Sequence, residues 1–215
     1  MSAPALEIAV DAVEPVPHAA APTLRFLLHA DDASGREVYT VALSAQIHIE
    51  PARRRYDGAD HARMGDLFGS PDRWPATTHG FMWAKVDRLV PSFTGHGTFD
   101  LLVPCTYDHE VAGVKYLASL DDGEVPLHFH FSGTILYRGV EDRLQMTQVP
   151  WTSSARFGLP VAVWREMIDG HFPGGGWLRL HRDTLAELRR RAAERGLPSM
   201  EAAVLDLLGS PGPVP

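Results

Sequence analysis

Apolar and polar residues alternate along much of the first 150 residues of the chain. Alternation with a period of two is typical of a β-strand, because successive side chains of a strand point to opposite faces. The turn-forming segment DDASGR separates two such stretches, residues 23–30 and 37–50, and predicts that they form an antiparallel hairpin. Apart from residues 109–120, the predicted strands cover residues 6–10, 23–30, 37–50, 80–91, 97–106, 127–139 and 145–151.

The segment HEVAGVKYLASL, residues 109–120, fits two periods. Val111, Val114 and Ala118 follow helical spacing, whereas the β-branched residues and the flanking turns favour a strand. We predict a strand, because DDGEVP at residues 121–126 has the composition of a hairpin turn that leads directly into the next strand.

Helical patterns are concentrated at the end of the chain, and each has a start and a stop of the expected type. The predicted helices cover residues 160–172 (from Pro160), 183–196 (Asp183 to Gly196) and 197–209 (Ser199 to Gly209). Strands first and helices last predict the α+β class, with a mainly antiparallel β-sheet and two to three C-terminal helices packed on it. The sheet is expected to form a sandwich or a half-barrel.

The domain organisation follows from the same pattern. We expect one α+β domain over residues 1–209, strand-rich in 1–151 and helical in 160–209, followed by a flexible tail at 210–215. No composition shift divides the chain convincingly, and no repeat is present.

Residues 51–80 interrupt the strand pattern with a polar stretch that contains several glycines and prolines. Within it, residues 60–69 are predicted to form a two-turn helix that Asp60 caps and Gly69 ends, and the rest is predicted to be loop. A connection of this length is often functional. The alternative is a cover over one edge of the sheet.

Composition limits the classes of function. The net charge of −7 argues against nucleic acid as the main ligand, since phosphate binding needs a basic surplus. No apolar run is long enough to span a bilayer, and the N-terminus lacks the pattern of a secretory signal. The single cysteine, Cys105, excludes an intrachain disulfide. We therefore expect a cytoplasmic protein.

The strand that begins PLHFHF places His128 and His130 on one face. Cupin-type barrels begin a metal site in this way, but they add a carboxylate a few residues on, which is absent here before Glu141. The pattern favours an ordinary strand with two histidines on its polar face. The alternating inward positions are Leu127, Phe129 and Phe131.

We therefore expect no metal and no cofactor. If a metal does bind, His128 and His130 are the candidate ligands, and folding would supply a third from His48, Asp108 or His109.

No catalytic residues are expected either. Cys105 has a possible base, His109, four residues away, but no oxyanion-binding loop accompanies the pair, and a lone cysteine is usually a buried apolar residue. Tryptophans at the surface would instead be candidates for binding a partner. The five tryptophans are Trp74, Trp83, Trp151, Trp164 and Trp177.

A series of phrases between about residues 65 and 208 carries a resemblance to a known family. They are VPCTYDHEVAGVKYLASLDDGEVPLHFHFSGTILY, VPW, LPVAVWREMIDGHFP and WLRLHRDTLAELRRRAAERGLPS, in this order and followed by a final Leu-Leu pair. The chain resembles an uncharacterised actinobacterial family of about 200 residues, whose genes often lie near those of a high-affinity NiFe-hydrogenase. The resemblance implies a cytoplasmic accessory role in assembling or supporting that enzyme.

This resemblance carries over no catalytic residues. In that family, apolar residues stand at the positions of His128 and His130, which argues against a shared metal site. A looser resemblance joins the first 50 residues to the export chaperone SecB, which begins with a short strand, a proline-broken connector and a long hairpin. It implies a sheet that offers a groove to unfolded chains.

The leading hypothesis is a non-enzymatic accessory protein that binds protein partners, with hydrogenase subunits or their maturation factors as candidates and a homo-oligomer left open. Its contact surface would comprise the sheet edge, the 51–80 segment and any exposed tryptophans. One alternative is a metal-dependent enzyme on a small β-barrel that uses His128 and His130. The other is a chaperone-like binder of unfolded segments.

Overall fold

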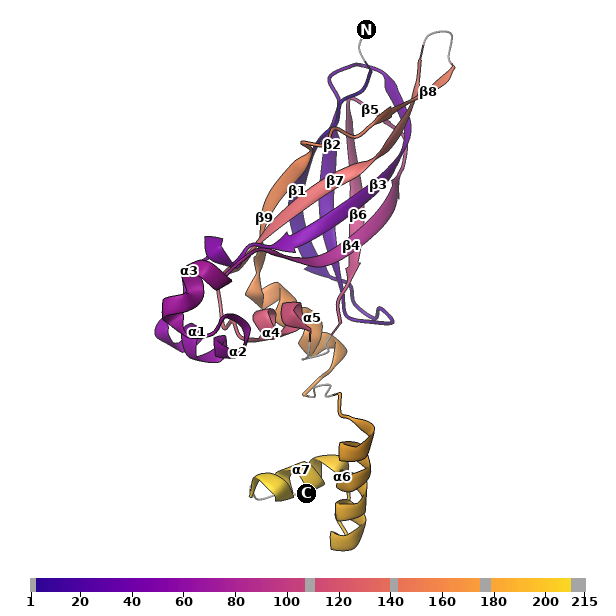
Figure 1. Cartoon of the computed structure of the whole chain (residues 1–215). Helices are drawn as coiled ribbons and strands as arrows, with labels where there is room; N and C mark the ends of the chain where they lie inside the picture. The colour runs from indigo at the N-terminus through magenta and orange to yellow at the C-terminus, as the bar shows by residue number, and fades with distance from the viewer. Residues whose placement is uncertain (1–2, 107–110, 140–142, 175–178, 210–215) are drawn as a thin grey trace. The chain divides into compact units, whose positions relative to one another are not determined.

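A computed structural model describes residues 3–106, 111–139, 143–174 and 179–209 of the chain (Figure 1). Contacts between residues group the chain into two compact units, Met1–Gly176 and Trp177–Pro215, and each is described by itself. The single domain over residues 1–209 stays a prediction. None of the described helices is both long and apolar enough to cross a membrane.

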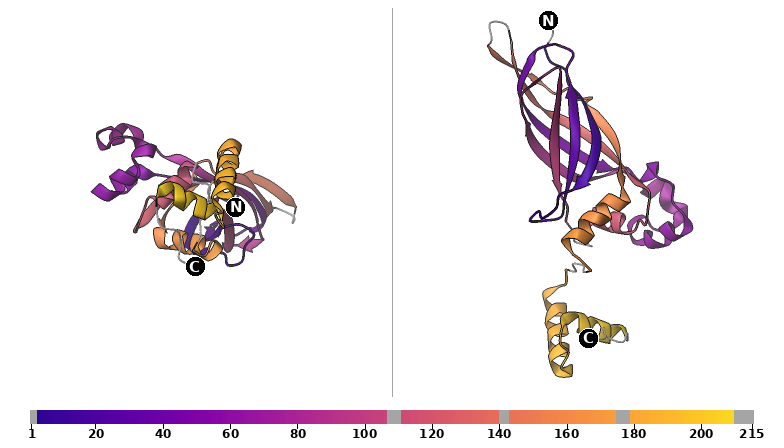
Figure 2. Two further views of the ribbon diagram at one scale, coloured as in Figure 1. Left: turned by 90° about the horizontal axis from the view of Figure 1, so that it is seen from below. Right: turned by 180° about the vertical axis from the view of Figure 1, so that it is seen from behind.

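The described part of the first unit contains one sheet of nine strands, all paired antiparallel (Figures 1 and 2). The strand order is β1-β2-β6-β5-β3-β7-β8, with β4 paired to β3 and β9 paired to β7. The two-residue strand β5 joins a three-stranded part, β1-β2-β6, to a part built around β3 and β7. The strands are β1 (Glu7–Pro15), β2 (Thr23–Asp31), β3 (Glu37–Ile49), β4 (Phe81–Val90), β5 (Phe93–Thr94), β6 (His96–Pro104), β7 (Glu124–Arg138), β8 (Leu144–Gln148) and β9 (Ser154–Pro160).

The core lies between these two parts of the sheet. Phe26 of β2 meets Phe129 of β7 and Phe157 of β9, with ring centroids 5.3 and 6.0 Å apart and near-perpendicular planes. Burying a phenylalanine side chain stabilises the folded state by about 1.5–3 kcal/mol.

The antiparallel sheet and the helices that accompany it confirm the α+β class with a mainly antiparallel sheet.

Helix α5 (Val161–His171) follows β9 and contacts β1, β2 and β9. The predicted helix over residues 160–172 is present, but Pro160, which was predicted to lie in its first turn, is instead the N-cap. The side chains of this helix that are buried against the core are Val161, Trp164, Met167 and Ile168.

The predicted hairpin of residues 23–30 and 37–50 is wrong. Both segments are strands, but β2 pairs with β1 and β6, and β3 pairs with β4, β5 and β7. The turn between them carries the chain from one part of the sheet to the other, and the backbone N–H of Asp32 donates to the carbonyl of Gly95 at 2.7 Å. Local alternation does not distinguish strands that pair from strands that face each other across a core.

The strand predicted over residues 109–120 is also wrong. Its described part contains helix α4 (Ala112–Ala118), in which Val114, Tyr116 and Leu117 are buried. Helical spacing therefore outweighed β-branched content, because this face meets an apolar cluster that the local sequence does not contain. Residues 119–123 connect α4 to β7, and residues 124–126 already belong to β7, so residues 121–126 do not form a hairpin turn between strands.

Residues 51–80 are largely helical, so the prediction of loop outside residues 60–69 is wrong. The predicted N-cap Asp60 is wrong: the N-cap of α1 is Asp57, whose carboxylate accepts from the N–H of Asp60 at 2.8 Å, and Asp60 completes a capping box in return. Gly69 ends α2 as predicted, at a φ of 75°. The elements are η1 (Pro51–Arg53), α1 (Gly58–Arg63), α2 (Gly65–Phe68), η2 (Pro71–Arg73) and α3 (Trp74–Thr77).

The second unit contains helices α6 (Arg182–Arg195) and α7 (Met200–Leu208). Gly196 and Gly209 end them in the left-handed conformation, and Ser199 caps α7, all as predicted. The predicted N-cap Asp183 is wrong, since His181 caps α6 through its ring nitrogen. Packing of these two helices on the sheet stays a prediction, and residues 210–215 lie outside the described part.

Candidate functional site

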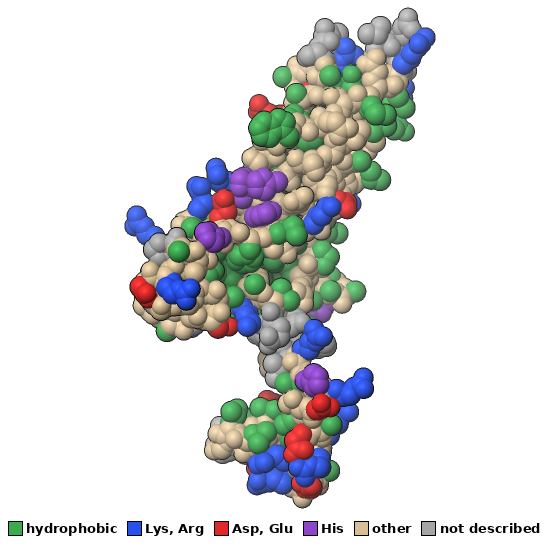
Figure 3. All heavy atoms as spheres, viewed as in Figure 1, with side chains coloured by type: hydrophobic (Ala, Val, Ile, Leu, Met, Phe, Trp, Pro, Cys, Tyr) green, Lys and Arg blue, Asp and Glu red, His purple; other side chains and the backbone are tan. Residues whose placement is uncertain are grey.

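Pairing of β3 with β7 brings three histidines together on the outer face of the sheet. His48 lies directly opposite His128, and Gln46 lies opposite His130. The ring centroids of His128 and His130 are 4.0 Å apart, and those of His48 and His130 are 5.2 Å apart. Figure 3 shows histidine side chains gathered on this face. We call His48, His128 and His130 the histidine cluster.

A carboxylate and two guanidinium groups border the histidine cluster. Atom Oε1 of Glu50 lies 3.4 Å from Nδ1 of His128. The other oxygen, Oε2, lies 3.5 Å from Nε of Arg53 and 3.6 Å from Nε of Arg156. This oxygen is buried and accepts no hydrogen bond from the described residues. The cluster therefore has an anionic neighbour that two cations hold in place.

Burial lowers the pKa of His48 and of His128 below the usual 6.5, and repulsion from His130 lowers both further. The charge of Glu50 acts in the opposite direction on both rings without reversing the shift. Both imidazoles are therefore neutral near pH 7, which is the form that serves as a hydrogen-bond acceptor or metal ligand.

The structure brings His48 to the predicted pair of candidate ligands, whereas Asp108 and His109 lie outside the described residues. Within the described parts of the chain, no three His, Cys, Asp or Glu side chains surround a common point as bound ligands would. The predicted orientation of β7 is confirmed, because its inward side chains are buried. These are Leu127, Phe129 and Phe131.

Cys105 is buried, and its thiol donates to the carbonyl of Val103 at 3.4 Å. Burial raises the pKa of this thiol to about 12. A nucleophile must be a thiolate, so this environment is that of an inert structural cysteine. His109, its possible base, lies outside the described residues.

Trp151 has a surface position that contrasts with those of the other described tryptophans. Its exposed fraction is 92%, whereas Trp74 and Trp164 are buried and Trp83 is half-buried. Trp177 lies outside the described residues. Exposing an indole to water is unfavourable, and tryptophan is enriched among the residues that anchor protein interfaces. Among the described tryptophans, Trp151 is thus the candidate for binding a partner.

Further apolar side chains are exposed on β8, the strand that precedes Trp151. Met146 and Leu144 are 72% and 52% exposed and share one face of the strand. Leu136 of β7 pairs with Met146, and these three side chains help to line a shallow hollow. We call Leu136, Leu144 and Met146 the β8 patch.

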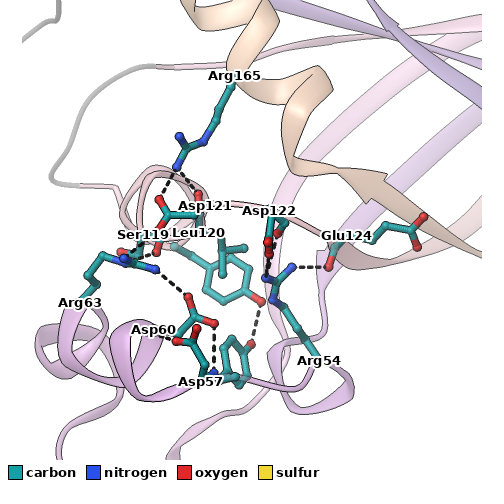
Figure 4. Close-up of polar contacts among 12 residues, drawn as sticks. Arg54, Asp57, Asp60, Arg63, Ser119, Leu120, Asp121, Asp122, Glu124 and Arg165 are labelled. Carbon is teal, nitrogen blue, oxygen red and sulfur yellow. Dashed lines mark hydrogen bonds and ion pairs between the residues drawn. The ribbon is translucent and has the colours of Figure 1, made fainter.

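A polar network joins the helical 51–80 segment to α4 and α5 (Figure 4). Arg63 contacts Asp60 and Asp121, each at 2.8 Å, and donates to the carbonyl of Ser119 at 2.7 Å. Arg165 of α5 reaches the same Asp121 at 2.9 Å. These arginines are bound to protein groups, and we assign the network to stability.

A second pair of histidines lies on the three-stranded part of the sheet. Nδ1 of His29 lies 2.7 Å from Asp11, and Nδ1 of His96 lies 2.7 Å from Asp31. The hydrogen bond to Asp11 raises the pKa of His29, with the charge of Asp31 adding to it and burial opposing it. No local sequence pattern singles out this group, because its residues come from strands far apart in the chain.

The fold and these surfaces define an α+β protein with a two-part antiparallel sheet, a buried cysteine and exposed apolar and histidine-rich patches. A family model covers residues 3–213 and is described as a family of unknown function (DUF6084). The chain belongs to this family, which confirms the resemblance to an uncharacterised family. No curated protein matches the chain.

Solved structures show only distant likeness to this chain. A CARDB domain of the PF1109 protein from Pyrococcus furiosus, in complex with di-metal ions, is 9% identical, covers 73% of this chain and 92% of its own, and has a TM-score of 0.28. A late embryogenesis abundant (LEA) protein is 11% identical, with coverages of 72% and 70% and a TM-score of 0.32. ApaA from Bordetella pertussis is 12% identical, with coverages of 73% and 93% and a TM-score of 0.26. Likeness this distant carries no argument about function.

Proposed function

We propose that this protein is a non-enzymatic accessory protein that binds another protein through Trp151 and the β8 patch. The single observation that carries the proposal is the 92% exposed fraction of Trp151. Covering an exposed indole with a partner's surface makes the free energy of binding more favourable. Tryptophans in such positions often contribute most of the binding energy of an interface.

Two features of the described residues favour binding over catalysis. Burial removes Cys105 from nucleophilic chemistry, since its pKa is raised to about 12. The arginine network of Figure 4 is engaged by carboxylates and carbonyls of the protein itself. By contrast, the side chains of the β8 patch project from the sheet at its β8 edge.

The proposed partners are subunits or maturation factors of a NiFe-hydrogenase in the cytoplasm. Support comes from the family resemblance described above, which is an argument from gene neighbourhood. An acidic protein with exposed apolar residues suits a protein partner better than a nucleic acid.

Affinity purification of the tagged full-length protein from its host, grown with hydrogenase induced, tests this proposal. Three proteins are compared: the wild type, Trp151→Ser and Leu102→Ser. Leu102 is an exposed apolar residue of β6, on the three-stranded part of the sheet, and serves as the matched control. We expect stoichiometric hydrogenase components with the wild type and Leu102→Ser, and at least about a tenfold loss with Trp151→Ser, as for an interface anchor worth 1.4 kcal/mol or more.

Equal recovery with all three proteins would contradict the proposed surface. Absence of hydrogenase components would contradict the proposed partner. Binding of many unrelated unfolded peptides by the purified protein would favour the chaperone-like alternative.

A further inference from the structure

The histidine cluster has the composition and backbone placement of a ligand set for a transition metal. Neighbouring antiparallel strands hold directly opposite Cβ atoms about 4.5–5.5 Å apart, and diagonal pairs remain within reach of long side chains. His48 and His128 form an opposite pair, and His48 and His130 form a diagonal one. The register of β3 and β7, which the buried face of the sheet fixes, thus sets the separation of all three side chains.

We propose that His48, His128 and His130 bind one divalent transition-metal ion of the zinc class on the outer face of the sheet. Imidazole nitrogen binds Zn²⁺ at 2.0–2.1 Å, which places two ligating nitrogens of a tetrahedral site about 3.3 Å apart. Ring centroids 4.0 and 5.2 Å apart allow that separation. Three imidazoles leave the fourth position to water or to a partner's side chain.

Glu50 supplies the support that such a site needs. Ligating histidines commonly donate their second ring N–H to a carboxylate, which fixes the tautomer and the ring orientation. Oε1 of Glu50 lies 3.4 Å from Nδ1 of His128, which leaves Nε2 of this ring for the metal. Arg53 and Arg156 hold the other oxygen of the carboxylate.

Binding requires the rings to turn. The planes of His48 and His130 cross at 79°, and those of His128 and His130 at 47°, so the three nitrogens do not yet share a point. His130 is exposed on a solvent-facing strand surface. Rotation of an exposed side chain between rotamers is fast and needs no change of the backbone.

The second histidine pair provides an internal comparison. His29 and His96 also lie near each other, with centroids 5.6 Å apart, but Nδ1 of each is already paired with a separate carboxylate, Asp11 or Asp31. This group offers two imidazoles against three in the histidine cluster. His96→Ala is therefore a matched control that removes one surface imidazole from the opposite part of the sheet.

Calorimetric titration of the chelator-stripped full-length protein with Zn²⁺ tests the proposal, with Co²⁺ absorption as a second readout. We expect one saturable site in the wild type and in His96→Ala, and loss of that site in His130→Ala and in His48→Ala. Glu50→Gln should weaken binding about 10–100-fold, as removal of a carboxylate that supports a ligand does. Zn²⁺ should raise the melting temperature of the wild type but not of His130→Ala.

No saturable Zn²⁺ binding by the wild type would overturn the proposal. So would a site that survives in His130→Ala or disappears in His96→Ala. His130 is exposed, so its alanine variant is expected to fold and keeps the test decisive if His48→Ala does not fold.

Discussion

The hydroxyl groups of Tyr56 and Tyr116 lie 2.7 Å apart and join the 51–80 segment to helix α4. Tyr56 also donates to the carbonyl of Pro51 at 2.8 Å, so the hydroxyl of Tyr116 donates to Tyr56. Burial raises the pKa of both phenols, which stay protonated. A chain of two neutral hydrogen bonds thus ends inside the core, where Tyr116 has no exposed surface.

The two tyrosines should respond unequally to loss of their hydroxyls. Tyr56→Phe leaves the buried hydroxyl of Tyr116 without its acceptor and is expected to cost about 1–3 kcal/mol of unfolding free energy. Tyr116→Phe leaves Tyr56 bound to Pro51 and should cost only about 0.5–1.5 kcal/mol. Urea unfolding of both variants and of the double variant measures these values. Equal costs would contradict the assigned donor order.

Arg54 is a second connection between the 51–80 segment and β7. It is 10% exposed and donates to the carbonyls of Asp122 and Glu124 at 2.8 and 2.9 Å. Arg54→Ala leaves two carbonyls without this donor and should cost about 2 kcal/mol. Arg54→Lys should recover only part of this, because an ammonium group lacks the planar fork that spans both acceptors. Full recovery by lysine in chemical unfolding would show that charge alone matters.

The sequence could predict the parts of the fold in which the local pattern of apolar and polar residues fits only one type of secondary structure. Alternation placed Phe129 inside and His130 outside, and helix ends were read correctly at Ser199 and Gly209. The alternation pattern failed at Val114, because the helical and the strand period both fit there. Packing against apolar residues distant in the chain favoured the helix. Strand β9 was missed, because residues 154–160 lack sustained alternation of apolar and polar residues.

The candidate sites depended on pairing between distant segments, which local pattern does not contain. The sequence could suggest His128 and His130, two residues apart, but it offered His48 only as one of three possible third ligands. His48 precedes His128 by 80 residues and joins the pair only through the β3–β7 register. Likewise, five tryptophans were visible, but which of them is exposed depends on the packing of the whole chain. The sequence could therefore name Trp151 only as one of five tryptophans that would bind a partner if they were exposed.

The His29–Asp11 contact predicts a pH dependence of stability. The pKa of His29 is raised above 6.5, so folding favours its protonated form. This contribution is fully present below pH 6.5 and is lost as the pH rises through the folded pKa of His29. Asp31 and His96, which also face this ring, remain in place in the variant Asp11→Asn.

Asp11→Asn should therefore lower the unfolding free energy more at about pH 5.5 than at about pH 8, by an amount reduced by solvent screening. Urea titrations at both values measure the difference. Asp72→Asn, a change of an exposed carboxylate in η2, is the control for net charge. An equal loss at both pH values would show that the contact does not depend on protonation of His29.

Gly133 should be the most demanding glycine of the sheet. It lies in β7 opposite Leu43 with a φ of 144°, and a Cβ built there would lie 2.0 Å from the carbonyl oxygen of Ala42. The backbone of the central strand β3 cannot move away without breaking its pairing, so Gly133→Ala is expected to lower the unfolding free energy by about 3 kcal/mol or more.

Gly170→Ala is the matched control, because this helical position has no atom within 4 Å of the added methyl. It should stabilise the protein by up to about 1 kcal/mol through helix propensity. Thermal unfolding of the two variants tests both expected changes in stability. An unchanged stability of Gly133→Ala would show that the backbones of β3 and β7 can adjust at this point and still stay paired.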